Sequence, residues 1–237
     1  MSVYRFKKAA VLGAGVMGAQ IAAHLANAGV PVVLFDLPAD GRDKNAIVNK
    51  ALANLGKLSP SPLASKALVN NIQAGNYDEH LALLADCDVI IEAIAERLDW
   101  KKSLYAKILP FVGPKAILAS NTSGLSINAL SEVLDESLHH RFCGLHFFNP
   151  PRYMHLVELI PCASTDTDVL VSLETFLVST LGKGVVYAKD TPNFIGNRIG
   201  VFSILSILHH TEKFKMGFDE VDALTGPLIG RPKSATY

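Results

Sequence analysis

Short apolar runs alternate with longer segments of helical period along most of this chain. The runs are rich in β-branched residues and lie at 9–12, 32–35, 89–94, 116–119, 144–147, 156–160 and 184–187. Runs of this length between turn residues are typical of buried strands, and helical segments fill most of the gaps. This alternation predicts βαβ units, so we expect an α/β fold built on a doubly wound, mostly parallel sheet.

One gap, from residue 43 to residue 83, is long for a single helical crossover. We expect two helices in it, broken at KLSPSPLAS, because Pro60 and Pro62 cannot occupy a helix interior. No strand is expected within this gap.

Composition narrows the classes of function. Lysine and arginine number 22, as do aspartate and glutamate, and no basic run stands out, so nothing favours a nucleic acid or an anionic membrane as partner. No apolar stretch approaches the roughly 20 residues of a membrane span, and a strand pattern begins too early for a signal peptide. Cys87, Cys143 and Cys162 lack disulfide or metal spacing. We therefore expect a cytoplasmic protein with reduced thiols and no metal, whose partner is a small molecule or another protein.

The stretch VLGAGVMG, residues 11–18, places a G-x-G-x-x-G motif between the first strand and the first helix. Its glycines allow the backbone to approach a pyrophosphate at the helix N-terminus. Asp36 ends the next strand, where a carboxylate bonds the adenosine ribose and repels a 2′-phosphate. This context predicts a Rossmann-type site that binds NAD in preference to NADP. The cofactor-binding residues expected here are Gly13, Gly15, Val16, Met17, Gly18 and Asp36.

Polar side chains also mark the ends of later strands, where ligands bind in open α/β sheets. Glu96 follows the third run, Asn121 and Ser123 follow the fourth, and His146 lies in the fifth. Glu92 interrupts the third run. We give Glu92 no catalytic role and expect it to face a helix N-terminus or water.

The stretch GLHFFNPPRYMHLVELI, residues 144–160, contains two apolar runs joined by about eight residues. This connection is too short for a parallel crossover, so the two strands should be antiparallel neighbours. His146 and Glu158 are equally distant from Arg152 and should therefore face each other. A carboxylate against an imidazole fixes the ring tautomer and stabilises imidazolium, which predicts a general base. A structural His-Glu pair is the alternative, and it is disfavoured beside a nicotinamide site.

The motifs GAGVMG, EAIAERLDWK, SNTSGLSI, GLHFFNPPRYMHLVEL and KDTPNFIGNR occur in this order along the chain. Together they resemble the L-3-hydroxyacyl-CoA dehydrogenase family over essentially the whole length. The resemblance implies NAD-dependent oxidation of the 3-hydroxyl of an acyl-CoA in fatty-acid β-oxidation, or the reverse reduction. It also implies roles for individual residues. His146 is expected to be the catalytic base and Glu158 its partner, while Ser123 and Asn197 are expected to bind the substrate. The residues expected near the nicotinamide of the cofactor are Glu96, Lys101, Asn121 and Ser123. Gly124 replaces a serine that is common in the family.

The resemblance also bears on domain organisation. We expect a dinucleotide-binding domain over residues 1–189. Residues 190–237 should begin an all-helical domain that is truncated here, because the helix expected over 193–216 is apolar on more than one face and needs neighbours. In the family this domain supplies one wall of the substrate cleft and the dimer contact, so we expect a homo-oligomer. The sequence leaves open whether this chain is part of a longer protein with a fused enoyl-CoA hydratase domain.

Three other functions remain open from the sequence. A related 3-hydroxy acid dehydrogenase could use the same scaffold on a substrate without coenzyme A. A lysine-dependent hydroxyacid dehydrogenase begins with a similar glycine loop but lacks the His-Glu hairpin. A non-enzymatic NAD-binding protein would bind NADH without turnover.

Overall fold

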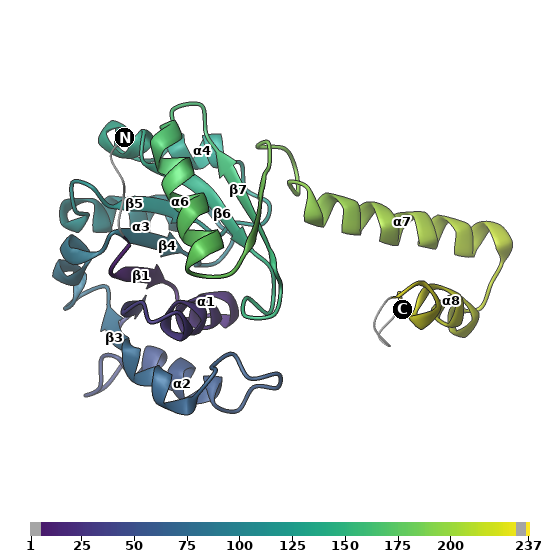
Figure 1. Cartoon of the computed structure of the whole chain (residues 1–237), viewed down its shortest axis with the longest axis horizontal. Coiled ribbons are helices and arrows are strands. Elements are labelled where there is room, and N and C mark those ends of the chain that lie inside the picture. The colour runs from purple at the N-terminus through teal and green to yellow at the C-terminus, as the bar shows by residue number, and fades with distance from the viewer. Residues whose placement is uncertain (1–5, 231–235) are drawn as a thin grey trace. The chain divides into compact units, whose positions relative to one another are not determined.

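The computed structural model describes residues 6–230 and 236–237 (Figure 1). The chain forms two compact units that divide between Pro192 and Asn193, and the roles expected for the two domains stay predictions. The two units are described separately below.

The first unit is built on one eight-stranded sheet in the order β3-β2-β1-β4-β5-β6-β7-β8. Neighbouring strands are parallel except for the antiparallel pair β6 and β7. The expected Rossmann-type sheet, mostly parallel with an antiparallel edge, is confirmed. The strands are β1 (Ala9–Leu12), β2 (Val32–Asp36), β3 (Ile72–Asn76), β4 (Val89–Glu92), β5 (Ile117–Ser120), β6 (Phe142–Phe147), β7 (Leu156–Pro161) and β8 (Gly184–Tyr187).

The long gap after β2 differs from the prediction of two helices. One α-helix, α2 (Ala46–Leu55), is followed by the 3-10 helices η1 (Lys66–Asn71) and η2 (Leu81–Asp86), with the edge strand β3 between them. The prediction was wrong here because IQAGN has little apolar alternation. Pairing with β2 makes this segment a strand, and tertiary context of this kind overrides a weak local preference.

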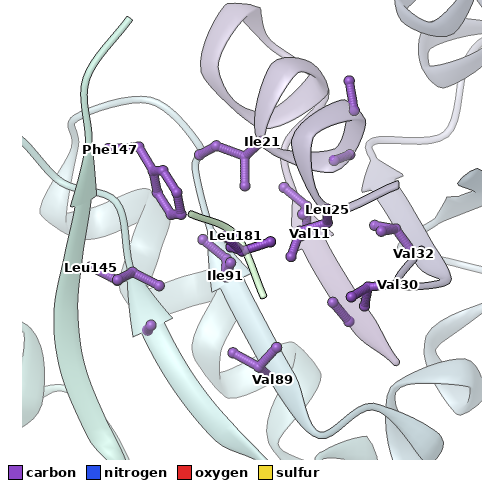
Figure 2. Packing of buried hydrophobic residues seen from close by; sticks show 14 of the residues in the cluster. Val11, Ile21, Leu25, Val30, Val32, Val89, Ile91, Leu145, Phe147 and Leu181 are labelled. Atoms are coloured by element: carbon purple, nitrogen blue, oxygen red, sulfur yellow. The ribbon is translucent and has the colours of Figure 1, made fainter. Parts of the chain in front are cut away.

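Helices cover both faces of the sheet. On one face, α1 (Val16–Asn27) and α6 (Thr167–Ser179) bury their apolar sides against alternate strand residues. Figure 2 shows part of this cluster, including Ile21 and Leu25 of α1 and strand residues such as Val11. On the other face lie α3 (Leu98–Ile108), the 3-10 helix η3 (Leu109–Phe111), α4 (Ile127–Glu132) and α5 (Glu136–His139). Tyr105 of α3 packs edge-on against Phe142 of β6. Each fully buried large apolar side chain stabilises this arrangement by about 1.5–3 kcal/mol.

The second unit contains α7 (Gly196–Phe214), α8 (Phe218–Thr225) and the 3-10 helix η4 (Pro227–Ile229). Large apolar side chains on α7 are exposed, including Ile199, Phe202 and Leu205 at 64%, 72% and 58%. The prediction that this unit begins a larger helical domain stays a prediction. Within residues 6–230 and 236–237, no helix is both long and apolar enough to cross a membrane.

Candidate active site

The glycine-rich loop leaves open space at the N-terminus of α1. Gly13 has a φ of +103°, and a Cβ there would lie 2.8 Å from the carbonyl oxygen of Ala93. A Cβ on Gly18 would lie 1.8 Å from the carbonyl oxygen of Gly13, so the helix and the loop can approach this closely only with glycine. A Cβ on Gly15, the N-cap of α1, would meet no atom within 4 Å. This open space, together with helix amides that no side chain caps, fits a pyrophosphate.

A cavity of about 520 Å³ opens beside the glycine loop, and Asp36 lines it. The Asp36 carboxylate accepts hydrogen bonds from the Ala14 amide at 2.6 Å and from the Leu37 amide at 2.7 Å. These bonds hold the carboxylate at the end of β2, as a ribose-binding role requires.

The two strands β6 and β7 bring a histidine and a glutamate together. His146 lies opposite Glu158 in the antiparallel register, so the predicted pairing is confirmed. The two atoms His146 Nδ1 and Glu158 Oε2 are 2.7 Å apart, and both side chains are buried. A carboxylate in this position favours the tautomer with a proton on Nδ1, which leaves Nε2 as the basic nitrogen.

Ser123 lies next to the basic nitrogen of the dyad. Its hydroxyl oxygen is 3.1 Å from His146 Nε2 and belongs to an exposed residue on the loop after β5. The hydroxyl can therefore contact both the base and a substrate oxygen placed beside it.

Glu96 holds the loop that carries Ser123. Its Oε1 atom accepts hydrogen bonds from the amides of Ser123 and Gly124, both at 2.8 Å, and from the hydroxyl of Thr122. Although partial burial opposes ionisation, these hydrogen bonds and the nearby Lys101 ammonium hold the pKa of Glu96 below its ordinary value. Glu96 therefore supports the Ser123 loop, a contact that its predicted cofactor role did not include.

A buried ionic network lies next to this loop. Glu92 is fully buried and accepts hydrogen bonds from Lys101 at 2.5 Å, Ser120 at 2.7 Å and Tyr105 at 2.9 Å. The expectation that Glu92 faces water or a helix N-terminus was wrong, because α3 presents a lysine and a tyrosine one turn apart to this carboxylate. That spacing of Lys101 and Tyr105, opposite a glutamate inside an apolar run, was the sequence signal for the network. The Lys101 ammonium also lies 3.8 Å from Glu96.

The remaining predicted residues occupy different environments. Asn121 is buried and joins β5 to β6 by accepting a hydrogen bond from the β6 backbone at 2.9 Å. Val16 is exposed at the start of α1 and Met17 is partly buried. Asn197 lies in the first turn of α7, in the second unit. The roles assigned to Asn121, Asn197 and the buried Lys101 stay predictions. Across the described parts of the chain, no three His, Cys, Asp or Glu side chains gather as a metal site.

Residues 8–191 match a family model described as 3-hydroxyacyl-CoA dehydrogenase, NAD binding domain. The chain belongs to this family. The match includes all eight strands, the glycine loop, the dyad and Ser123, so the site described above lies within a 3-hydroxyacyl-CoA dehydrogenase NAD-binding domain. NAD is the cofactor of this domain, and the open side of Gly15 fits it.

Relatives extend the similarity to almost the whole chain. A probable 3-hydroxyacyl-CoA dehydrogenase of Deinococcus radiodurans is 46% identical over 98% of this chain and 68% of its own length. A putative fatty acid oxidation complex trifunctional enzyme of Rickettsia felis is 43% identical over 98% of this chain, which spans only 32% of that protein. The crystal structure of M. tuberculosis FadB2 is 29% identical, with a TM-score of 0.82 over 96% of this chain and 79% of FadB2.

Proposed function

We propose that this chain oxidises the 3-hydroxyl of L-3-hydroxyacyl-CoA to a ketone with NAD, and catalyses the reverse reduction. The observation that carries the proposal is the buried His146–Glu158 dyad within hydrogen-bond distance of Ser123, inside an NAD-binding domain of the 3-hydroxyacyl-CoA dehydrogenase family. The name of the Rickettsia felis relative supports a place in fatty-acid oxidation.

The dyad supplies the proton transfer. NAD held by the glycine loop and Asp36 would supply the acceptor for the hydride that leaves C3 of the substrate. His146 Nε2 takes the hydroxyl proton, while Nδ1–H remains bonded to Glu158, whose charge stabilises the imidazolium. General-base assistance of this kind is typically worth ~10²–10⁴ in rate. In the reverse direction His146 returns the proton to the ketone oxygen.

Two further side chains position the substrate in this proposal. The Ser123 hydroxyl, beside Nε2, orients the oxygen that loses or gains the proton. Asn197 is proposed to bind the substrate from the start of α7, and the resemblance to the family supports this role.

The experiment is an assay of NADH oxidation with acetoacetyl-CoA, run in parallel with acetoacetate as the free acid. We expect turnover with the thioester and little with the free acid. His146→Ala should lower kcat at least about a hundredfold with little change in NADH affinity, because the imidazole acts on the proton. Preferred turnover of the free acid would instead support a dehydrogenase without coenzyme A. NADH binding without turnover of either substrate would support the non-enzymatic alternative.

The setting of the protein is also part of the proposal. The three free, buried cysteines support a reducing compartment, which we take to be the cytoplasm. The word trifunctional in the name of the Rickettsia felis relative supports a longer protein with further activities, and we propose that one of them is a hydratase. Cell fractionation followed by detection of the protein would test both proposals. The fraction that contains the protein identifies its compartment, and its mass shows whether this chain is part of a longer protein.

A further inference from the structure

One stripe of α3 forms a wall of the 520 Å³ cavity that Asp36 lines. Trp100, Ser103, Leu104 and Lys107 contribute to this wall and follow the spacing i, i+3, i+4, i+7, which places them on one side of the helix. Lys101, Tyr105 and Ile108 of the same helix are almost fully buried in the first unit. Within the wall, Leu104 is also buried and Lys107 pairs with Asp78, so the core and this ion pair leave the large side chain of Trp100 without a structural explanation.

Trp100 is the largest side chain of this stripe and the single tryptophan of the sequence. It is 50% exposed, although tryptophan is usually well buried. The guanidinium carbon of Arg97 lies 4.6 Å from the centre of its ring, and Arg97 is itself held by two hydrogen bonds to Asp99. The indole is thus oriented at the cavity without being packed in the core.

Tyr77 lines the same cavity from the segment after β3. Its ring stacks on Phe35 with the centroids 6.1 Å apart, and the residue is only 4% exposed. Its buried hydroxyl has no hydrogen-bond partner of good geometry within residues 6–230 and 236–237, and its polar neighbours include the Gly13 backbone and the Asp36 carboxylate. Burial and the neighbouring carboxylates raise the pKa of Tyr77, so the hydroxyl keeps its proton and remains a donor. A buried hydroxyl without a partner is unfavourable, and a ligand oxygen would satisfy it.

We propose that Trp100 and Tyr77 recognise the adenosine half of the cofactor, with the indole stacking on adenine and the Tyr77 hydroxyl bonding the ribose that Asp36 also binds. The inference deepens the proposed function, because it rests on NAD being the cofactor. Stacking suits this wall, since a purine presents a flat π-face and Leu37 adds apolar surface to the same cavity. The Tyr77 hydroxyl lies beside Asp36, where the ribose is expected. In this proposal the Asp36 carboxylate accepts a hydrogen bond from one ribose hydroxyl, and the Tyr77 hydroxyl donates to the neighbouring ribose oxygen.

The test uses ADP-ribose, which keeps the adenosine half and lacks nicotinamide. Calorimetric dissociation constants are compared for the parent chain and for Trp100→Ala, Trp100→Phe and Tyr77→Phe. We expect Trp100→Ala to weaken binding by roughly tenfold, Trp100→Phe to recover most of the loss, and Tyr77→Phe to weaken binding by about fivefold. In the parent chain, ADP-ribose should also change the fluorescence of the single tryptophan.

Tyr187→Phe is the matched control, because Tyr187 lies on β8 at the opposite edge of the sheet and bonds Glu174. It should bind ADP-ribose as the parent does. Binding by Trp100→Ala and Tyr77→Phe within twofold of the parent would overturn the proposal, as would a parent chain that does not bind ADP-ribose. Since ADP-ribose binding requires no turnover, failure of the acetoacetyl-CoA assay would not affect this result, and the two proposals fail separately.

Discussion

The two nitrogens of His146 have different partners, and this difference gives the ring its direction. Glu158 lies 2.7 Å from Nδ1, while Ser123 lies 3.1 Å from Nε2 on the exposed loop. Proton exchange with a substrate is therefore confined to Nε2. A single side chain can act as base in oxidation and as acid in reduction without changing its tautomer.

This pairing could be predicted from residue spacing, because the side chains of a tight antiparallel pair are symmetric about the turn. The register of His146 with Glu158 confirms it. The support of Ser123 by Glu96 could not be predicted, since it joins residues 27 positions apart through backbone amides that carry no sequence signal. Apart from the His146–Glu158 pair, sequence reasoning recognised the type of each polar residue but not which of them contact one another.

Cofactor choice is a prediction at the scale of one residue. Asp36 lines the cavity and its carboxylate is fixed by two backbone amides, so a 2′-phosphate there would meet a negative charge. We expect the dissociation constant for NADPH to exceed that for NADH by about tenfold or more. Asp36→Asn keeps an acceptor for the Ala14 amide but removes the charge, so it should reduce the difference between the dissociation constants for NADPH and NADH. Equal dissociation constants for the two cofactors in the parent would remove Asp36 from this role.

At the scale of elements, the loop between β5 and α4 is held by carboxylates at both ends. Glu96 bonds residues 122–125, and Asp190 accepts hydrogen bonds from the Ser126 hydroxyl and from the amides of Ile127 and Asn128. Although partial burial opposes ionisation, these bonds lower the pKa of Asp190. The loop that carries Ser123 is therefore fixed by charge-assisted bonds, which are stronger than neutral ones.

Removing the Glu96 carboxylate should misplace Ser123. We expect Glu96→Ala to lower kcat at saturating NADH by about ten- to hundredfold, because small displacements of a positioned group are costly. Glu96→Gln retains an oxygen that can accept hydrogen bonds from the amides of Ser123, Gly124 and Leu125, so it should recover most of kcat. For each variant, kcat at saturating NADH and the dissociation constant of NADH are measured separately. An unchanged kcat with weakened NADH binding would show that Glu96 acts on the cofactor alone.

Helix α1 contains a buried histidine that makes stability depend on pH. Burial, reinforced by the charges of Lys183 and Arg152, lowers the pKa of His24 to about 4, against an ordinary value of 6.5. Between these values the unfolded chain binds more protons than the folded chain, so stability falls as the pH drops from about 6.5 towards 4. The effect is on the order of 2–3 kcal/mol.

Urea unfolding at several pH values measures this dependence. His24→Leu cannot titrate and should lose less stability than the parent across the window. His140→Leu, at an exposed histidine on the surface of the first unit, should behave like the parent. The assignment fails if the slopes of stability against pH are the same for His24→Leu and the parent.

Elements with strong periodicity were predictable, whereas β3 was not. The apolar runs of β1 and β4 could be recognised as strands, because strands buried on both faces of a parallel sheet have continuous apolar sequences. At the sheet edge, IQAGN is a strand only because β2 offers its hydrogen-bonding groups. Such a segment depends on a neighbour that lies far away in the sequence.

At the scale of the whole molecule, the order of strands in the sheet determines where the residues of the candidate site lie. The carboxyl ends of β1, β2 and β4 meet at the cofactor cavity, and β5 and β6 follow next in the sheet with Ser123 and His146. Residues from five distant parts of the sequence are therefore neighbours because the sheet is parallel from β3 to β6. The second unit contributes Asn197 only as a prediction.

The exposed apolar side of α7 should drive association between copies of the chain. We expect light scattering to show a mass that rises with concentration, because an apolar patch of this kind is unfavourable in water. Phe202→Glu should shift the chain towards monomer, since Phe202 is 72% exposed at the middle of this side. Val171→Glu, at an exposed valine on α6, is the control and should leave the mass unchanged. A parent chain that is monomeric at all concentrations would contradict the expectation.

Strand β7 is paired on both sides, with β6 and with β8, so that Glu158 faces His146 on one side and Val186 on the other. Its register is therefore fixed by pairing on both sides as well as by the connecting residues 148–155, whose carbonyls at Pro151 and Met154 bind the buried Lys183 ammonium. Because backbone carbonyls make these contacts, side chains in the connection can change over evolutionary time while the acid and the base stay together. Descendants of such a domain can diverge in those side chains and still inherit the same His-Glu pair.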